Sequence, residues 1–168
     1  MFAHDPAIAD NTSSHDTATV QDFIRRYDDT IAAADFDTLP SFFDDQILVI
    51  TPTSSRCVTR AEFVAAAEAR AAQMVSPVRT ESPEQPSAEP AARGSDSSPR
   101  AELIEQATTP LGGHCWLTSA HWRLTLGDRP LELYSDFVVR RTDDDLRIAA
   151  YLPRQDLPQL LNEAAGQV

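Results

Sequence analysis

The residues from Leu131 to Leu152, LELYSDFVVRRTDDDLRIAAYL, decide the fold of this chain. Apolar side chains alternate along Leu131–Val139 and Leu146–Leu152, as in strands whose successive side chains point to opposite faces. The run Thr142–Asp145 lies between them and supplies turn chemistry, because Asp side chains bond their own backbone and tolerate bends. We predict a long β-hairpin here. Since both parities carry apolar residues, we expect both of its faces to be covered.

More strands are predicted directly before this hairpin. Ala101–Thr109 and His114–Leu126 read as strands, and Leu111–Gly113 and Gly127–Pro130 carry the glycine and proline of turns. The second half of the chain therefore forms a meander of antiparallel strands. After it, Gln155–Glu163 forms either a short terminal helix or an extended tail.

Helical periodicity dominates the first half of the chain. Thr19 is a suitable N-cap for the first helix, and Thr59 with Glu62 has the spacing of a capping box that opens another. The predicted elements, in order, are a helix over Val20–Ala34, a short helix over Thr38–Phe43, a buried strand over Ile47–Thr51 and a helix from Thr59 to Met74.

Length and composition indicate one domain with an insertion. A chain of 168 residues, 42% of them hydrophobic, is long enough to bury a single core. Residues 76–100 are rich in Pro, Ser and Glu, and cannot bury enough apolar surface to offset the entropy lost on ordering. We expect a flexible tail at residues 1–18, one domain at 19–158 with a disordered insertion at 76–100, and a tail at 159–168. The insertion is either a tolerated loop or a regulatory, partner-binding segment.

The net charge of −12 and a pI near 4.6 argue against a nucleic-acid binder and against docking on anionic membranes. The chain has no basic and apolar leader and no membrane-spanning run, so we expect a cytoplasmic protein. All 14 basic residues are Arg, which together with the many alanines indicates a GC-rich bacterial genome.

No metal site and no cofactor are predicted. Cys57 and Cys115 form neither a disulfide framework nor a CxxC pair, so we interpret them as reduced thiols. His114 and His121 are seven residues apart on one predicted strand, hence on opposite faces and roughly 20 Å apart. They cannot share a metal. The chain also has no Gly-rich phosphate loop and no nucleophile elbow.

Two helices, a strand and a helix, followed by a meander of long strands, make an α+β layout. Within about two-thirds of the chain, the sequence resembles the SnoaL-like, nuclear-transport-factor-2-like superfamily. The resembling stretches are Ile24–Tyr27, Ala34–Asp37, Phe42–Pro52, Ala120–Leu124 and Ser135–Ile148. The resemblance implies a cone-shaped roll, in which a curved antiparallel sheet wraps around N-terminal helices and encloses an apolar pocket.

The ketosteroid isomerases of this superfamily supply a comparison for the site. The resemblance places their oxyanion-binding tyrosine on Tyr27 and their oxyanion-binding aspartic acid near Asp136. It places Thr51 where those enzymes carry their catalytic aspartate, and a threonine hydroxyl cannot take a proton from carbon near neutral pH. The resemblance therefore implies half a site, in which Tyr27 and Asp136 hold a ligand oxygen.

The residue patterns leave the placement of these side chains open. Tyr27 lies on the apolar face of a predicted helix, as a pocket residue or as a core tyrosine. Asp136 faces either the pocket or the outer side of the sheet, where Arg123 or a dimer partner would bond it. Because His121 and Trp122 have opposite parity, only one of them faces the pocket.

Two functions follow from this interpretation. The protein binds a small apolar molecule without catalysis, or it is a cofactor-independent isomerase, cyclase or dehydratase acting on a small carbonyl-containing substrate. A cone plugged by Phe and Trp would favour the first. We also expect a homodimer through the outer sheet face, and a raised pKa for Asp136, because no Arg is predicted inside to neutralise it. The pocket-lining candidates are Tyr27, Thr51, Trp122 and Asp136, and the catalytic candidates are Tyr27, Asp136 and His121.

Overall fold

The computed structural model describes residues 6–75, 100–126, 129–143, 145–157 and 159–160. Most of the predicted insertion and of the C-terminal tail therefore lies outside the described residues. The elements, in chain order, are helix α1 (Pro6–Ala32), the 3₁₀ turn η1 (Leu39–Phe42), strands β1 (Phe43–Ile50) and β2 (Ser55–Thr59), helix α2 (Arg60–Val75), and strands β3 (Arg100–Gly112), β4 (Cys115–Leu126), β5 (Arg129–Thr142) and β6 (Asp145–Pro153).

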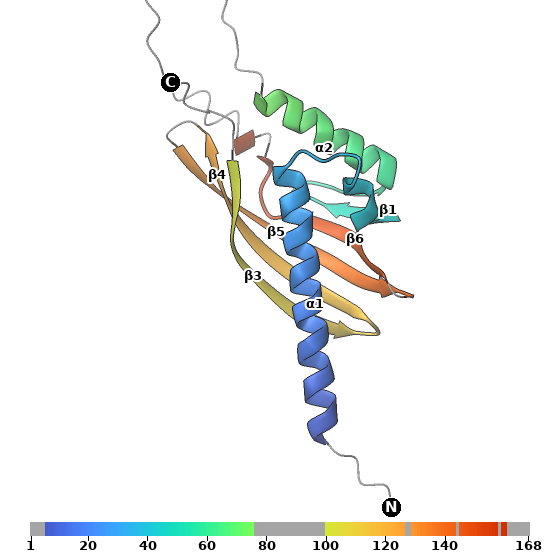
Figure 1. The fold of residues 1–168 in the computed structure, drawn as a ribbon. Helices are drawn as coiled ribbons and strands as arrows, with labels where there is room; N and C mark the ends of the chain where they lie inside the picture. The colour runs from blue at the N-terminus through green and yellow to red at the C-terminus, as the bar shows by residue number, and fades with distance from the viewer. Residues whose placement is uncertain (1–5, 76–99, 127–128, 144, 158, 161–168) are drawn as a thin grey trace, which may run out of the picture.

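Within the described residues, six strands form one sheet in the order β2-β1-β6-β5-β4-β3. The sheet curves around α1, and α2 packs over β1 and β2 (Figure 1). Neighbouring strands are antiparallel except β1 and β6, which run parallel. The expected α+β roll is confirmed. Its sheet is mixed rather than antiparallel, because β1, from the first half of the chain, lies beside the last strand.

The hairpin predicted over Leu131–Leu152 is confirmed as β5 and β6. Asp143 lies in the turn between them with φ +53°, a conformation that Asp tolerates better than most residues. Between Val138 and Val139 the register shifts by one residue, so that Phe137 pairs with Tyr151 and Val139 pairs with Ile148. This bulge brings Tyr151 to the same face as Phe137.

Helix α1 begins at Pro6, well before the expected start at Val20. The tail predicted over residues 1–18 is therefore helical from Pro6 onward. Residues 6–18 contain no glycine, and proline is favoured in the first turn of a helix, so no local signal ends the helix once its later turns pack on the sheet.

The predicted capping box at the start of α2 is confirmed. The backbone N–H of Thr59 donates to Glu62 Oε2 at 2.8 Å, and the N–H of Glu62 donates to Thr59 Oγ1 at 3.3 Å. The bond from Thr59 lowers the pKa of Glu62 below its ordinary value. Strand β2, directly before this cap, was not predicted.

Alternation along β4 and β5 defines two faces of the sheet. The face that carries Trp122 and Phe137 and packs against α1 is called the inner face. The opposite face is called the outer face. Trp116, Thr118 and Ala120 of β4 are also buried on the inner face. The core thus lies between the inner face and one side of α1, whose buried residues are Val20, Phe23, Ile24 and Tyr27.

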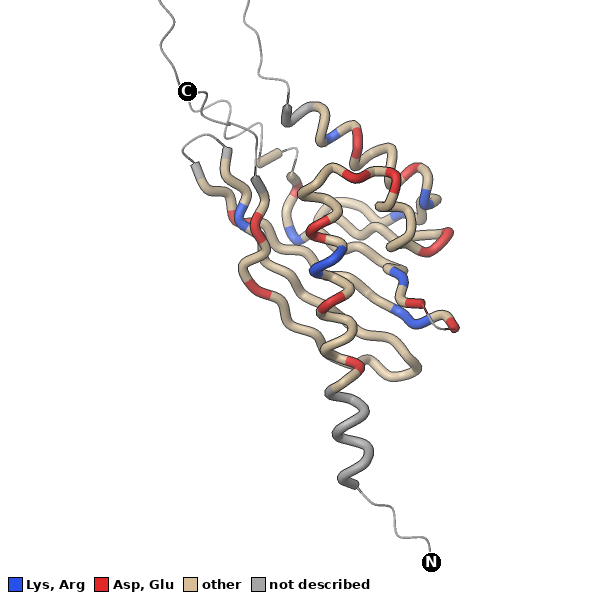
Figure 2. The backbone as a smooth tube through the Cα atoms, in the orientation of Figure 1, with Lys and Arg blue, Asp and Glu red and all other residues tan. Residues whose placement is uncertain are grey.

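Acidic residues lie along both helices and the loops next to them (Figure 2). No helix of the described part is long and apolar enough to span a membrane.

Candidate functional site

A carboxyl group lies half-buried against the inner face. The indole Nε1 of Trp122 donates a hydrogen bond to Asp28 Oδ1 at 2.7 Å, joining α1 to β4. Burial raises the pKa of the Asp28 carboxyl above its ordinary value, although the indole bond opposes this. Asp28 can therefore accept a hydrogen bond or, when protonated, donate one.

Tyr27, the neighbour of Asp28, is enclosed by aromatic rings. Its ring centroid lies 5.5 Å from that of Phe137 and 5.8 Å from those of Phe42 and Phe43. Burial raises the pKa of the Tyr27 phenol well above its ordinary value. Tyr27 is thus a core tyrosine with a neutral hydroxyl, the second of the two placements that the sequence left open.

Two hydroxyl groups also lie on the inner face, one on each of the last two strands. Ser135 Oγ lies 3.5 Å from Tyr151 Oη. The Tyr151 ring packs between Phe63 of α2, at 5.6 Å, and Phe137, at 5.4 Å. Polar groups from α1, β4, β5 and β6 therefore face the same interior.

Apolar side chains that are only partly buried surround these polar groups. Trp122 pairs with Leu103 on β3 and with Leu133 on β5, and its partner Asp28 lies one turn before Ile31. We call this region, where α1 finishes, the distal end of the inner face. Its partly buried apolar residues are Ile31, Leu103, Leu133 and Tyr151. Such a surface suits an apolar ligand that carries a polar group.

Asp136 lies on the outer face, and the prediction that pairs it with Tyr27 is wrong. Ser119 Oγ donates to Asp136 Oδ1 at 2.5 Å, and Arg154 donates to both carboxylate oxygens at 2.8 and 2.9 Å. It is Phe137, the next residue of β5, that contacts Tyr27. Arg154, followed by the Ser119 hydroxyl, holds the pKa of Asp136 below its ordinary value. The predicted rise is therefore also wrong, since the arginine after β6 outweighs desolvation.

His121 also lies on the outer face. Its Nε2 is 2.5 Å from Glu132 Oε2, and its ring stacks on Tyr134 with centroids 4.3 Å apart. Arg123 donates to the other oxygen of Glu132 at 2.9 Å. The inference that His121 and Trp122 face opposite sides is confirmed, and Trp122 is the inward one. The three catalytic candidates do not converge.

Thr51 belongs to the turn between β1 and β2. Its Oγ1 accepts from the backbone N–H of Ser54 at 3.0 Å and lies 2.9 Å from Ser54 Oγ. Its backbone N–H donates to the Ser54 carbonyl at 2.8 Å. The Thr51 hydroxyl therefore shapes this turn.

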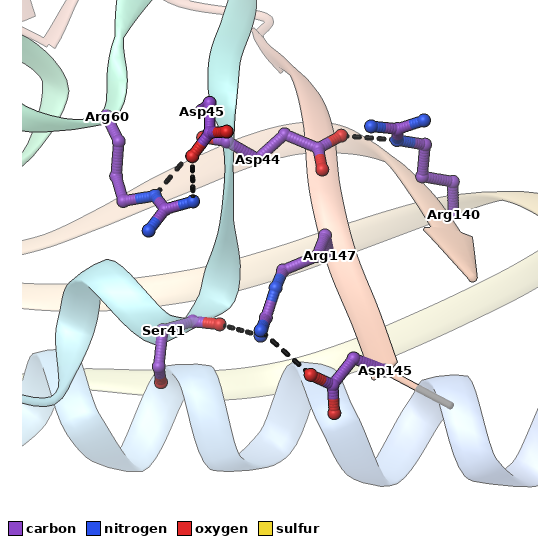
Figure 3. A network of polar contacts seen from close by, with 7 residues as sticks. All are labelled: Ser41, Asp44, Asp45, Arg60, Arg140, Asp145 and Arg147. Atoms are coloured by element: carbon purple, nitrogen blue, oxygen red, sulfur yellow. Dashed lines mark hydrogen bonds and ion pairs between the residues drawn. The ribbon is translucent and has the colours of Figure 1, made fainter. Parts of the chain in front are cut away.

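A charged network lies around a hollow of about 650 Å³ beside the β5–β6 turn (Figure 3). Arg140 Nε donates to Asp44 Oδ2 at 2.5 Å. Arg60 bonds Asp45, and Arg147 bonds Asp145 and the Ser41 carbonyl. These bonds link β1, α2, β5 and β6. Because each guanidinium in the network has a carboxylate partner, the network presents no unpaired cation.

Sequence reasoning missed Asp28, Ser135 and Tyr151. Asp28 is four residues after Ile24 and three before Ile31, at the edge of the apolar face of α1, and this spacing was a usable signal. Ser135 shares the parity of Phe137. The part of the chain that the structure describes holds no group of three or more His, Cys, Asp or Glu side chains placed to bind a metal ion.

Comparisons with known proteins bear on the fold. No family model and no curated protein sequence matches the chain. Three similar solved structures are nuclear-transport-factor-2-like proteins of unknown function from Shewanella oneidensis and Pseudomonas putida, and a domain of unknown function with a cystatin-like fold from Nostoc punctiforme.

The Shewanella protein is 12% identical, with a TM-score of 0.60 over 83% of this chain and 98% of its own. The Pseudomonas protein is 12% identical, with a TM-score of 0.62 over 87% and 92%. The Nostoc domain is 14% identical, with a TM-score of 0.60 over 92% and 87%. At these identities the likeness concerns the fold alone. The chain therefore has the cystatin-like, nuclear-transport-factor-2-like α+β fold that these structures share.

Proposed function

We propose that the protein binds a small, largely apolar molecule at the distal end of the inner face, beside the Asp28 carboxyl and the Trp122 indole. The observation that carries this proposal is the set of partly buried apolar side chains that surrounds Asp28 and Trp122. A ligand bound here would complete the burial of these side chains.

Binding is supported over catalysis by the surroundings of the titratable groups. A catalytic site needs at least two such groups within reach of one reacting atom. His121 and Asp136 lie on the outer face, engaged with Glu132 and with Arg154. Around Tyr27 the interior is filled by phenylalanine rings. We therefore favour a binding protein over a cofactor-independent isomerase, cyclase or dehydratase.

The test is a titration with Nile red, a neutral apolar dye that fluoresces more strongly in apolar surroundings. Leu133 and Val138 are both half-buried on β5. Leu133 lies on the inner face and Val138 on the outer face. We expect saturable binding that Leu133→Gln weakens about tenfold, the loss of roughly 1.4 kcal/mol of apolar contact. Val138→Gln should have little effect. Failure to saturate, or an equal loss in Val138→Gln, contradicts the proposal.

We further propose a homodimer through the outer face. Leu117 and Val138 are partly buried there, and Tyr134 is 37% exposed. Charged neighbours on this face are paired with each other, Glu132 with Arg123 and Asp136 with Arg154. A second copy would therefore meet apolar side chains between compensated charges, although the chain as a whole carries a net charge of −12.

A further inference from the structure

An arginine continues the inward side of α2. Phe63, Ala67 and Arg70 lie at positions i, i+4 and i+7, which share one side of a helix. Phe63 is buried and Ala67 packs against the core. Arg70 is half-buried one turn further on. Arg70 thus occupies a position at which the periodicity of α2 predicts an apolar residue.

The Arg70 side chain bends back along α2. Its Nε donates to the carbonyl of Ala66 at 3.0 Å, so the guanidinium lies over the preceding turn. The described residues supply no carboxylate partner for Arg70, whereas Arg60, Arg140 and Arg154 each have one. Within the described part of the chain, the Arg70 guanidinium is therefore open to an anion.

Two tyrosines lie on the side of the core that Phe63 contacts. Phe63 packs against Tyr151, and Tyr151 and Tyr27 both pack against Phe137. Burial raises the pKa of Tyr27 first; Tyr151 raises it further and the Arg70 charge lowers it, so both groups lie within electrostatic reach of Tyr27. The Arg70 guanidinium and the Tyr151 hydroxyl, from α2 and β6, suit an oxygen anion.

We propose that Arg70 receives the head group of the ligand, and that the ligand is an amphipathic anion, an apolar body that ends in one carboxylate. This inference rests on the proposed function and adds the chemical class of the ligand. The body would lie against Leu133 and Ile31, and the carboxylate would pair with Arg70. A chain of net charge −12 repels anions in general, so a half-buried guanidinium without a carboxylate partner among the described residues would give this site its selectivity.

The experiment is calorimetric titration of the full chain with dodecanoate and with dodecan-1-ol, which differ only in the head group. We expect dodecanoate to bind at least about tenfold more tightly than the alcohol. Arg70→Gln should remove this preference by weakening dodecanoate binding, and Arg70→Lys should keep part of it. The matched control is Arg25→Gln on α1, whose guanidinium is exposed and pairs with Asp22; the preference should survive it.

The two proposals fail in different ways. Equal affinity for both ligands in the unaltered protein overturns the role of Arg70 and leaves the proposed function standing. An unchanged preference in Arg70→Gln, with the fold intact by circular dichroism, overturns it as well. If neither ligand binds, the proposed function itself is wrong.

Discussion

At the scale of single residues, the parity of β5 decides which side chains belong to the site. Ser135 and Phe137 point inward, and Asp136 between them points outward to Arg154. A strand side chain changes face with a shift of one residue, so a position inferred to within about one residue could not place this carboxylate. The parity of Phe137 alone would have placed it correctly.

The Asp136 carboxyl should titrate below its ordinary pKa of 3.8. A group whose pKa is lowered by folding stabilises the fold above its ordinary pKa, and this contribution is lost as the pH falls through the folded value. We expect Asp136→Asn to cost about 0.5 to 1 kcal/mol at pH 7 and almost nothing at pH 2, as measured by urea unfolding. An NMR titration of the carboxyl carbon with a midpoint at or above 3.8 would contradict this account.

Asp28 should show the opposite dependence, because burial raises its pKa. A carboxyl whose pKa is raised by folding favours the fold below its ordinary pKa, and this benefit is lost as the pH rises through the folded value. Asn at this position keeps an acceptor for the Trp122 indole without the charge. We expect Asp28→Asn to be more stable than the unaltered protein at pH 7, by less than about 1 kcal/mol, and Asp28→Ala to be less stable. Thermal unfolding of both variants at pH 4 and pH 7 checks this, and equal losses in both at pH 7 would refute it.

At the scale of elements, short sequence patterns predicted the elements that form through contacts between residues close together in the chain. The β5–β6 hairpin and the start of α2 follow from alternation, an Asp-rich turn and a capping box, all visible within a few residues. The helical residues 6–18 and strand β2 carry weak local signals, and they form because α1 packs on the sheet and β2 pairs with β1. The parallel pairing of β1 with β6 depends on the whole chain.

The cap of α2 should matter for stability, because this helix carries Arg70. The hydroxyl of Thr59 accepts from the N–H of Glu62. Thr59→Ala should lower the free energy of unfolding by about 1 kcal/mol, and Thr59→Ser, which keeps the hydroxyl, should cost much less. Chemical denaturation compares the two variants, and equal losses would show that the cap contributes nothing.

At the scale of the whole molecule, the outer face should hold a second copy. We expect a dimer in analytical ultracentrifugation at tens of micromolar protein, which Leu117→Glu on β4 should convert to a monomer. Ala65→Glu, at an exposed position of α2, should leave the dimer intact. A monomer in the unaltered protein at these concentrations, or no effect of Leu117→Glu, would contradict the proposed dimer.

The candidate site is also a property of the whole molecule. Asp28 and Trp122 are 94 residues apart in the sequence, and each carried a local signal of helix face or strand parity. Their contact needed the packing of α1 on β4, which no sequence motif encodes. The position of Arg70 could not be predicted from the sequence for the same reason. The side of α2 that carries it faces the core only because Phe63 packs against Tyr151.

The most direct test of a ligand site at the distal end of the inner face is NMR measurement of nuclear Overhauser effects between bound dodecanoate and the protein. The account predicts contacts from the alkyl chain to Ile31 and Leu133, and from the methylene beside the carboxylate to the ring of Tyr151. Contacts to Leu117 and Val138 of the outer face instead, or no intermolecular contacts at saturating ligand, would contradict it.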